Sequence, residues 1–172
     1  LRIAGCLFPR IWVRSDIGNC KTIRQMSAKN EVWWTAPAQS EDGQTVLVSG
    51  RDCMDEAMAS GKYNDRVEIT WVYSPAPDGL PDTPVAELME QADNALREAL
   101  KKEKGCLLTG VYTGAGERNW VFYVKRTGIF QSMLNRAWAD LPLLPVSISA
   151  EKDPGWEEYR EMRDATYIPD GE

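Results

Sequence analysis

Apolar and polar residues alternate one by one in several short stretches of the chain, which is the period of a β-strand with one buried face. The clearest stretch is 66–73, where the side chains of Val67 and Ile69 fall on the same side. Further short runs are rich in β-branched and aromatic residues and are bounded by turn residues: 31–36, 45–49, 106–113, 119–125 and 146–150. The sequence therefore predicts six strands, and the first two are expected to pair as a hairpin.

A longer segment repeats its apolar residues every three or four positions, which is the period of an amphipathic helix. We expect this helix to begin with Thr83 as its N-cap and with Pro84 in the first helical position. Gly105 is expected to end it. Shorter helices are predicted at 52–60, at 130–141 and around 156–162.

The order of the predicted elements indicates the fold. From residue 66 to residue 150 it is strand, helix, strand, strand, helix, strand. Because strand–helix–strand connections are right-handed, this order predicts a four-stranded antiparallel sheet with both helices on one face. The predicted class is α+β: a ferredoxin-like βαββαβ sandwich with an additional N-terminal β-hairpin and a short C-terminal helix. A length of 172 residues suits a single domain.

The composition restricts the chemistry. The chain contains no histidine, which excludes a Ser-His-Asp or Cys-His nucleophile and a histidine-ligated zinc. It holds 20 basic and 26 acidic residues, and the formal net charge of −6 argues against nucleic-acid binding. No sequence motif for a cofactor or a metal is present. We therefore predict no catalytic residue, no metal site and no cofactor.

The first 25 residues differ from the rest of the chain in charge. They carry five basic residues and one acid, which leaves 15 basic and 25 acidic residues in 26–172, a net charge of −10. We predict that 1–25 is an extension outside a single domain formed by 26–172. The competing interpretation is a processed signal, because Ile3–Cys6 matches a bacterial lipoprotein box in which Cys6 would carry the lipid.

The expected location is the cytoplasm. No apolar run reaches the length of a membrane span, and no two of the four cysteines form a CxxC pair. A reduced protein without a membrane partner fits these features best. If residues 1–25 are the remnant of a signal, the protein is lipid-anchored or secreted instead.

Two motifs resemble a known family. They are Gly116-x-Arg118-x-Trp120 with Tyr123, and Asp153-Pro154-x-Trp156-x-x-Tyr159. Over about residues 31–163 the chain resembles the bacterial family called domain of unknown function 695. That family has no established activity, cofactor or catalytic residues to transfer. Some of its relatives are similar to the ribonuclease E inhibitor B family of small acidic regulators, which implies a regulatory role by analogy of fold alone.

The aromatic residues have two interpretations. Seven tryptophans and six tyrosines are many for this length, and filling the core is what we expect of Trp71 and Trp138. Alternatively, part of the set forms a recognition surface with an arginine, because Trp, Tyr and Arg dominate the hot spots of interfaces. The candidate recognition residues are Arg118, Trp120, Tyr123, Trp33 and Trp34.

Two hypotheses for the function remain open. The leading one is a non-enzymatic, acidic binding or regulatory module that attracts a basic protein partner electrostatically. The alternative is an Asp/Glu-based hydrolase, with or without a metal, that has no recognisable motif. Such an enzyme requires a pocket with converging carboxylates and a carboxyl group of raised pKa. The identity of the partner or substrate and the oligomeric state stay open.

Overall fold

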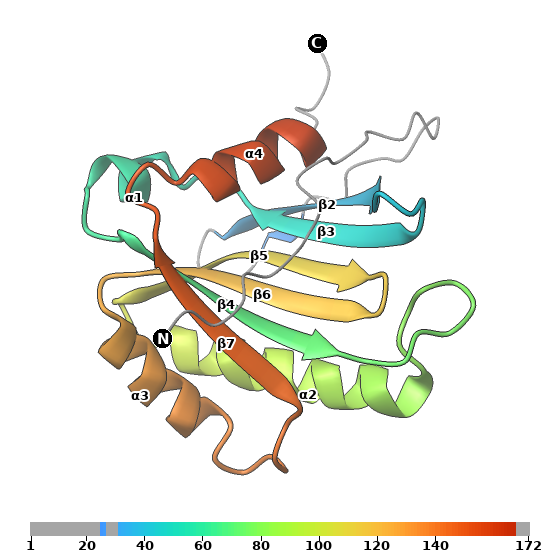
Figure 1. Cartoon of the computed structure of the whole chain (residues 1–172). Helices are drawn as coiled ribbons and strands as arrows, with labels where there is room; N and C mark the ends of the chain where they lie inside the picture. Colours follow the sequence, from blue (N-terminus) through green and yellow to red (C-terminus); the bar gives the residue numbers. More distant parts are fainter. Residues whose placement is uncertain (1–24, 27–30, 168–172) are drawn as a thin grey trace.

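An antiparallel sheet forms the centre of the structure (Figure 1). This computed structural model describes residues 25–26 and 31–167. Within them, seven strands lie in the order β1-β2-β3-β5-β6-β4-β7. The strands are β1 (Gln25–Met26), β2 (Val32–Gln39), β3 (Thr45–Arg51), β4 (Asp65–Val72), β5 (Cys106–Gly114), β6 (Glu117–Val124) and β7 (Val146–Lys152). The helices are α1 (Asp55–Ala59), α2 (Thr83–Leu100), α3 (Thr127–Ala137) and α4 (Glu157–Thr166).

All six predicted strands are present, and the α+β class is confirmed. The predicted N-terminal hairpin is formed by β2 and β3. It extends the sheet, because β3 pairs with β5 from Val46 to Gly50. The short strand β1, which the sequence pattern did not predict, lies beside β2.

The predicted N-terminal extension falls almost entirely outside the described residues, and so does Cys6. Gln25, the last residue of that predicted extension, belongs to β1 and pairs with Trp33. In the part of the chain that the structure describes, no helix is long and apolar enough to cross a membrane.

The start of α2 corrects one prediction. The N-cap is Asp82, not Thr83: the Asp82 backbone is extended, and its carboxylate accepts a hydrogen bond of 3.1 Å from the Val85 N–H. Pro84 therefore occupies the second helical position. The helix also ends earlier than predicted, at Leu100, and a short non-helical segment leads to Gly105.

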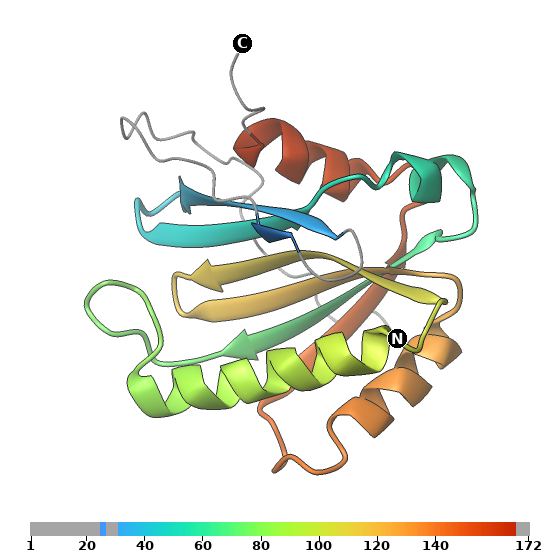
Figure 2. The same cartoon turned by 180° about the vertical axis from the view of Figure 1, so that it is seen from behind.

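The helices cover the two faces of the sheet unequally. Helices α2 and α3 pack on one face, as the view from behind shows (Figure 2). Helix α4 packs on the other face, over β2 and β3. The first core lies between the sheet and α2/α3 and includes Trp71, Met89, Leu96, Trp120, Phe122 and Phe130. The second core lies between the sheet and α4 and includes Trp34, Val46, Val48, Tyr123, Trp156 and Met162.

Strand β6 contributes to both cores because its side chains alternate between the faces. Trp120 and Phe122 point into the first core, whereas Val121 and Tyr123 point into the second. The side chains from Asn119 to Val124 are all buried for this reason. A strand that is covered on both sides is apolar at consecutive positions, which explains the sequence WVFYV.

Candidate functional site

The five candidate recognition residues do not form one exposed surface. Trp33 and Trp120 lie in the first core, and Trp34 and Tyr123 lie in the second core on the opposite face of the sheet. At most 8% of any of these four side chains is exposed. Arg118 retains 19% exposure of its side chain. The aromatic residues thus build the cores, as expected for Trp71, and partner recognition by these five residues stays a prediction.

Three of the five residues are nevertheless brought together by an acid on α2. The Asp93 carboxylate accepts hydrogen bonds from Trp120 Nε1 at 2.8 Å, from Arg118 Nη2 at 3.3 Å and from Arg97 Nε at 2.6 Å. The Arg97 guanidinium lies 4.7 Å from the centre of the Trp33 ring, and that of Arg118 lies 5.0 Å from the Trp120 ring. We call this group the Asp93 network; its members are Asp93, Arg97, Arg118, Trp33 and Trp120. It joins α2 to β2 and β6 through charge and aromatic contacts.

The network keeps Asp93 ionised. Burial disfavours the charged form of Asp93. The pKa of Asp93 is nevertheless lowered, because Arg97 contributes a positive charge and a hydrogen bond, Trp120 a hydrogen bond and Arg118 a positive charge. Burial lowers the pKa of Arg118, although Asp93 opposes this shift. A carboxylate with a lowered pKa does not act as a general acid near neutral pH. The network is therefore a structural ion cluster rather than a pair of catalytic carboxylates.

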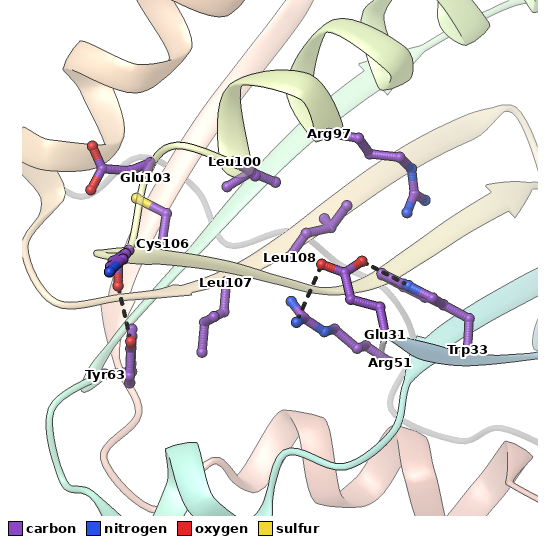
Figure 3. A pocket seen from close by; sticks show the side chains of 11 residues that line it. Glu31, Trp33, Arg51, Tyr63, Arg97, Leu100, Glu103, Cys106, Leu107 and Leu108 are labelled. Atoms are coloured by element: carbon purple, nitrogen blue, oxygen red, sulfur yellow. Dashed lines mark hydrogen bonds and ion pairs between the residues drawn. The ribbon is translucent and has the colours of Figure 1, made fainter. Parts of the chain in front are cut away.

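A pocket of about 340 Å³ opens beside the Asp93 network (Figure 3). It lies between the N-terminal end of β2, the C-terminal end of β3, the C-terminal end of α2 and the start of β5. Its lining combines apolar walls with charged groups: Glu31, Trp33, Arg51, Tyr63, Arg97, Leu100, Glu103, Lys104, Cys106, Leu107 and Leu108. Arg97 and Trp33 belong to both the pocket and the network.

The polar groups of the pocket are incompletely paired. Glu31 accepts a hydrogen bond of 3.5 Å from Trp33 Nε1 and lies 3.4 Å from Arg51 Nη2. The Nε of Arg51 is buried and has no hydrogen-bond partner among the described residues. Burial, followed by the nearby charge of Glu103, raises the pKa of the Cys106 thiol to about 12. The thiol therefore stays protonated and forms part of the apolar wall.

The pocket lacks the features of a hydrolytic site. Its two carboxylates both have cationic partners: Glu31 pairs with Arg51, and Glu103 lies 3.6 Å from Arg136. Among the described residues, no group of three or more Cys, Asp or Glu side chains could hold a metal ion.

The second motif builds the second core. Tyr123 donates a hydrogen bond of 2.7 Å to Asp153, and its ring stacks on Trp156 with 3.9 Å between the ring centres. Asp153 also accepts hydrogen bonds from the backbone N–H groups of Glu157 and Glu158, which fixes the start of α4. Both motifs singled out in the sequence thus have a structural role, and Tyr123 of the first motif joins the second motif in the second core.

The chain matches the Family of unknown function (DUF695) over residues 33–162. It belongs to this family. The match covers both cores, the Asp93 network and most of the pocket. No curated protein and no solved structure is detectably similar to the chain. The functional residues of this DUF695 domain therefore have to be inferred from its own structure.

One end of the DUF695 domain is strongly acidic. The turn 40–45, the segment 74–90 and the turn 114–117 meet there (Figure 1), because a Cβ on Gly79 would lie 3.6 Å from the backbone of Ala115 and 3.7 Å from the side chain of Gln44. These segments contain no Lys or Arg. They carry Glu41, Asp42, Asp78, Asp82, Glu87, Glu90 and Glu117, all exposed except the half-buried Glu117. We call these three segments the acidic end.

Part of the opposite end of the strands is basic. The segments 61–64, 101–105 and 125–126 meet there, through hydrogen bonds from Tyr63 Oη to the Lys104 carbonyl at 3.0 Å and from the Lys125 N–H to the Gly105 carbonyl at 2.8 Å. They contain one acid, Glu103, and six exposed basic residues: Lys62, Lys101, Lys102, Lys104, Lys125 and Arg126. We call these segments the basic end, and the pocket opens there. The periodicity of the sequence did not reveal this polarity, because it appears only when the strands are paired.

Proposed function

We propose that this DUF695 protein is a non-enzymatic binding module that docks a basic protein partner on its acidic end. The observation that carries this proposal is the gathering of seven acids and no base on three contiguous segments. A concentrated negative field steers a positively charged partner toward that end and fixes its orientation. A uniform spread of the same charges would give weaker steering.

A regulatory role is supported by the architecture of the core. We assign the core to the ferredoxin-like class on the strand order β5-β6-β4-β7, with α2 and α3 on one face of the sheet. We expect the same arrangement in the small acidic ribonuclease E regulators, to which some relatives of the family are proposed to be similar. This support for a regulatory role is an analogy of fold alone, and the proposed binding function is argued from the charged surface instead.

The hydrolase alternative has less support. It needs a carboxyl group with a raised pKa in a cleft that holds a second carboxylate. Asp93, the buried acid beside the pocket, has a lowered pKa instead. Glu31 and Glu103 are each paired with an arginine, so neither is free to act as a base.

The cytoplasm is the location that we propose for this module. Of the two cysteines among the described residues, Cys53 is exposed and Cys106 is buried, and both are free thiols. Free thiols are typical of proteins that work in a reducing compartment. An exposed thiol such as that of Cys53 would be prone to oxidation outside the cell.

The test compares two charge-reversal variants of the full chain that have equal net charge. The first carries Glu41→Lys, Glu87→Lys and Glu90→Lys at the acidic end, and the control carries Glu157→Lys, Glu161→Lys and Asp164→Lys on α4. All six side chains are exposed. Each purified chain is used to capture partners from native lysate at low and at high salt.

We expect the wild-type chain and the α4 control to retain the same stoichiometric basic protein at low salt and to release it at high salt. The acidic-end variant is expected to lose it. Equal capture by the two variants would place the docking surface elsewhere. Absence of any partner of the wild-type chain at either salt concentration would contradict the binding function itself.

A further inference from the structure

We propose that the pocket at the basic end binds a small amphipathic carboxylate, a ligand with one anionic head group and an apolar body. This site is separate from the acidic end, where the protein partner is proposed to dock. It therefore gives the module a second, small-molecule ligand. The argument rests on the charge around the pocket, on the Arg51 guanidinium group that lines it and on its apolar walls.

The charge around the pocket favours an anion. Three basic side chains and two acidic side chains line it. Ion pairs that lead out of the pocket add Asp93, which pairs with Arg97, and Arg118, which pairs with Asp93. They also add Arg136, which pairs with Glu103. The connected set has five basic members and three acidic members, a net charge of +2: Arg51, Arg97, Lys104, Arg118 and Arg136 against Glu31, Asp93 and Glu103. The five other exposed cations of the basic end reinforce this potential.

The head group has a specific place to bind. Figure 3 shows Arg51 reaching the pocket from β3 and Arg97 reaching it from α2. The Nε of Arg51 is buried without an acceptor among the described residues, and its Nη2 has only a long contact of 3.4 Å with Glu31. A guanidinium group binds a carboxylate through two parallel N–H groups. A ligand carboxylate would bind the Nη groups of Arg51 in place of Glu31, because the Nε itself is too buried for a ligand in the pocket to reach.

The apolar body has walls to contact. The side chains of Leu100, Leu107 and Leu108, the indole of Trp33 and the protonated thiol of Cys106 line the pocket between the charged groups. Its volume of about 340 Å³ lies near the lower limit of ligand pockets, which span about 300–1,000 Å³. The pocket thus suits a small molecule rather than a peptide segment.

Simpler ligands satisfy only part of this site. An inorganic anion would pair with the guanidinium groups and leave the apolar walls in contact with water. A neutral apolar molecule would cover the walls and remove water from the Arg51 and Arg97 guanidinium groups without pairing them, which is costly. An amphipathic carboxylate satisfies both parts of the lining at once.

The probe for the test is octanoate, titrated into the full chain by isothermal titration calorimetry. Acetate carries the same head group without the apolar body, and octan-1-ol carries the apolar body without the charge. We expect saturable binding of octanoate at one site per chain and binding of acetate and octan-1-ol that is weaker by about tenfold or more. If octan-1-ol bound as tightly as octanoate, the proposal that the ligand needs an anionic head group would be wrong.

Two pocket variants are expected to act in opposite directions. Arg51→Met removes the head-group donor and should weaken octanoate binding about tenfold or more. Glu31→Gln removes the competing carboxylate beside Arg51 and should tighten binding several-fold. The control Lys102→Met makes the same charge change as Arg51→Met at an exposed residue of the basic end that does not line the pocket. It should leave the affinity nearly unchanged.

The opposite signs separate a binding effect from a folding effect. A loss of fold weakens binding in any variant, but it cannot tighten binding in Glu31→Gln. Equal affinity of the wild-type chain and Arg51→Met for octanoate would overturn the proposal, and so would the absence of octanoate binding to the wild-type chain. Neither result would bear on the acidic end, because the protein partner is tested with residues far from this pocket.

Discussion

The Asp93 carboxylate on α2 accepts a hydrogen bond of 2.8 Å from the indole nitrogen of Trp120 on β6. Trp120 is fully buried in the first core, where its N–H group needs an acceptor. The carboxylate that provides it would be unstable in the core without cations, and Arg97 and Arg118 supply them. One tryptophan in the core is thus linked to the whole Asp93 network, which ties α2 to the sheet.

Removal of the carboxylate should therefore destabilise the fold. We expect Asp93→Ala to lower the free energy of unfolding by about 2–3 kcal/mol, because it leaves the Trp120 N–H without an acceptor and two partly buried guanidinium groups without their carboxylate. Arg118 keeps only its hydrogen bond of 3.0 Å to the Thr113 hydroxyl. Urea denaturation at neutral pH measures this change. The control is Asp140→Ala, an exposed acid, with an expected change within about 0.5 kcal/mol. Similar values for the two variants would show that the network adds no stability.

The same carboxylate makes stability depend on pH. The pKa of Asp93 in the folded chain lies below its ordinary value of 3.8, because the arginines and Trp120 outweigh burial. The unfolded chain therefore takes up the proton first as the pH falls. The stabilisation is complete above the ordinary pKa and is lost as the pH falls through the folded-state pKa.

We therefore expect the difference in unfolding free energy between the wild-type chain and Asp93→Asn to be constant above about pH 5 and to shrink below about pH 4. Urea denaturation at a series of pH values measures it. Using the difference between the two chains removes the contribution of the other acids. A difference that stays constant down to about pH 3 would contradict a lowered pKa of Asp93.

Most of the fold could be predicted from the sequence because its signals are local. The alternation of Val67, Ile69 and Trp71 follows from the face of β4 that packs in the first core, although the polar residues Glu68 and Thr70 on its other face are buried as well. The apolar stripe of α2 follows from its packing on the sheet. The prediction of Thr83 as the N-cap of α2 is wrong, because Asp82 and Thr83 are both good capping residues and are adjacent in the sequence. Only the backbone conformation distinguishes them.

The candidate sites could not be predicted in the same way, because they depend on contacts between distant segments. Asp93 lies on the side of α2 that faces the sheet, next to the buried Ala92, and it pairs with Arg97 one turn later. A lone acid beside an apolar stripe, four residues before an arginine, was the available signal. Nothing local indicated that Trp120, 27 residues further along the chain, would be its partner. The pocket likewise collects residues from 31 to 108.

A glycine in β3 offers a test of the second core. Gly50 pairs with Trp34 on β2, and the Trp34 ring occupies the space where a Cβ on Gly50 would lie. Trp34 is 1% exposed and donates a hydrogen bond of 2.9 Å to the Thr166 hydroxyl on α4. We expect Gly50→Ala to displace the ring and to lower the free energy of unfolding by about 2–3 kcal/mol, as overpacking in a rigid core does.

The matched control is Gly128→Ala in α3, where an added Cβ has no neighbour within 4 Å. Alanine favours a helix more than glycine does, so this variant should gain about 0.5 kcal/mol. Urea denaturation compares the two variants, and the NMR signal of the Trp34 indole N–H reports whether the ring has moved. If Gly50→Ala left both the stability and that signal unchanged, the close approach of Trp34 to β3 would be wrong. The packing of α4 on the second core, which the Trp34–Thr166 hydrogen bond supports, would then need another explanation.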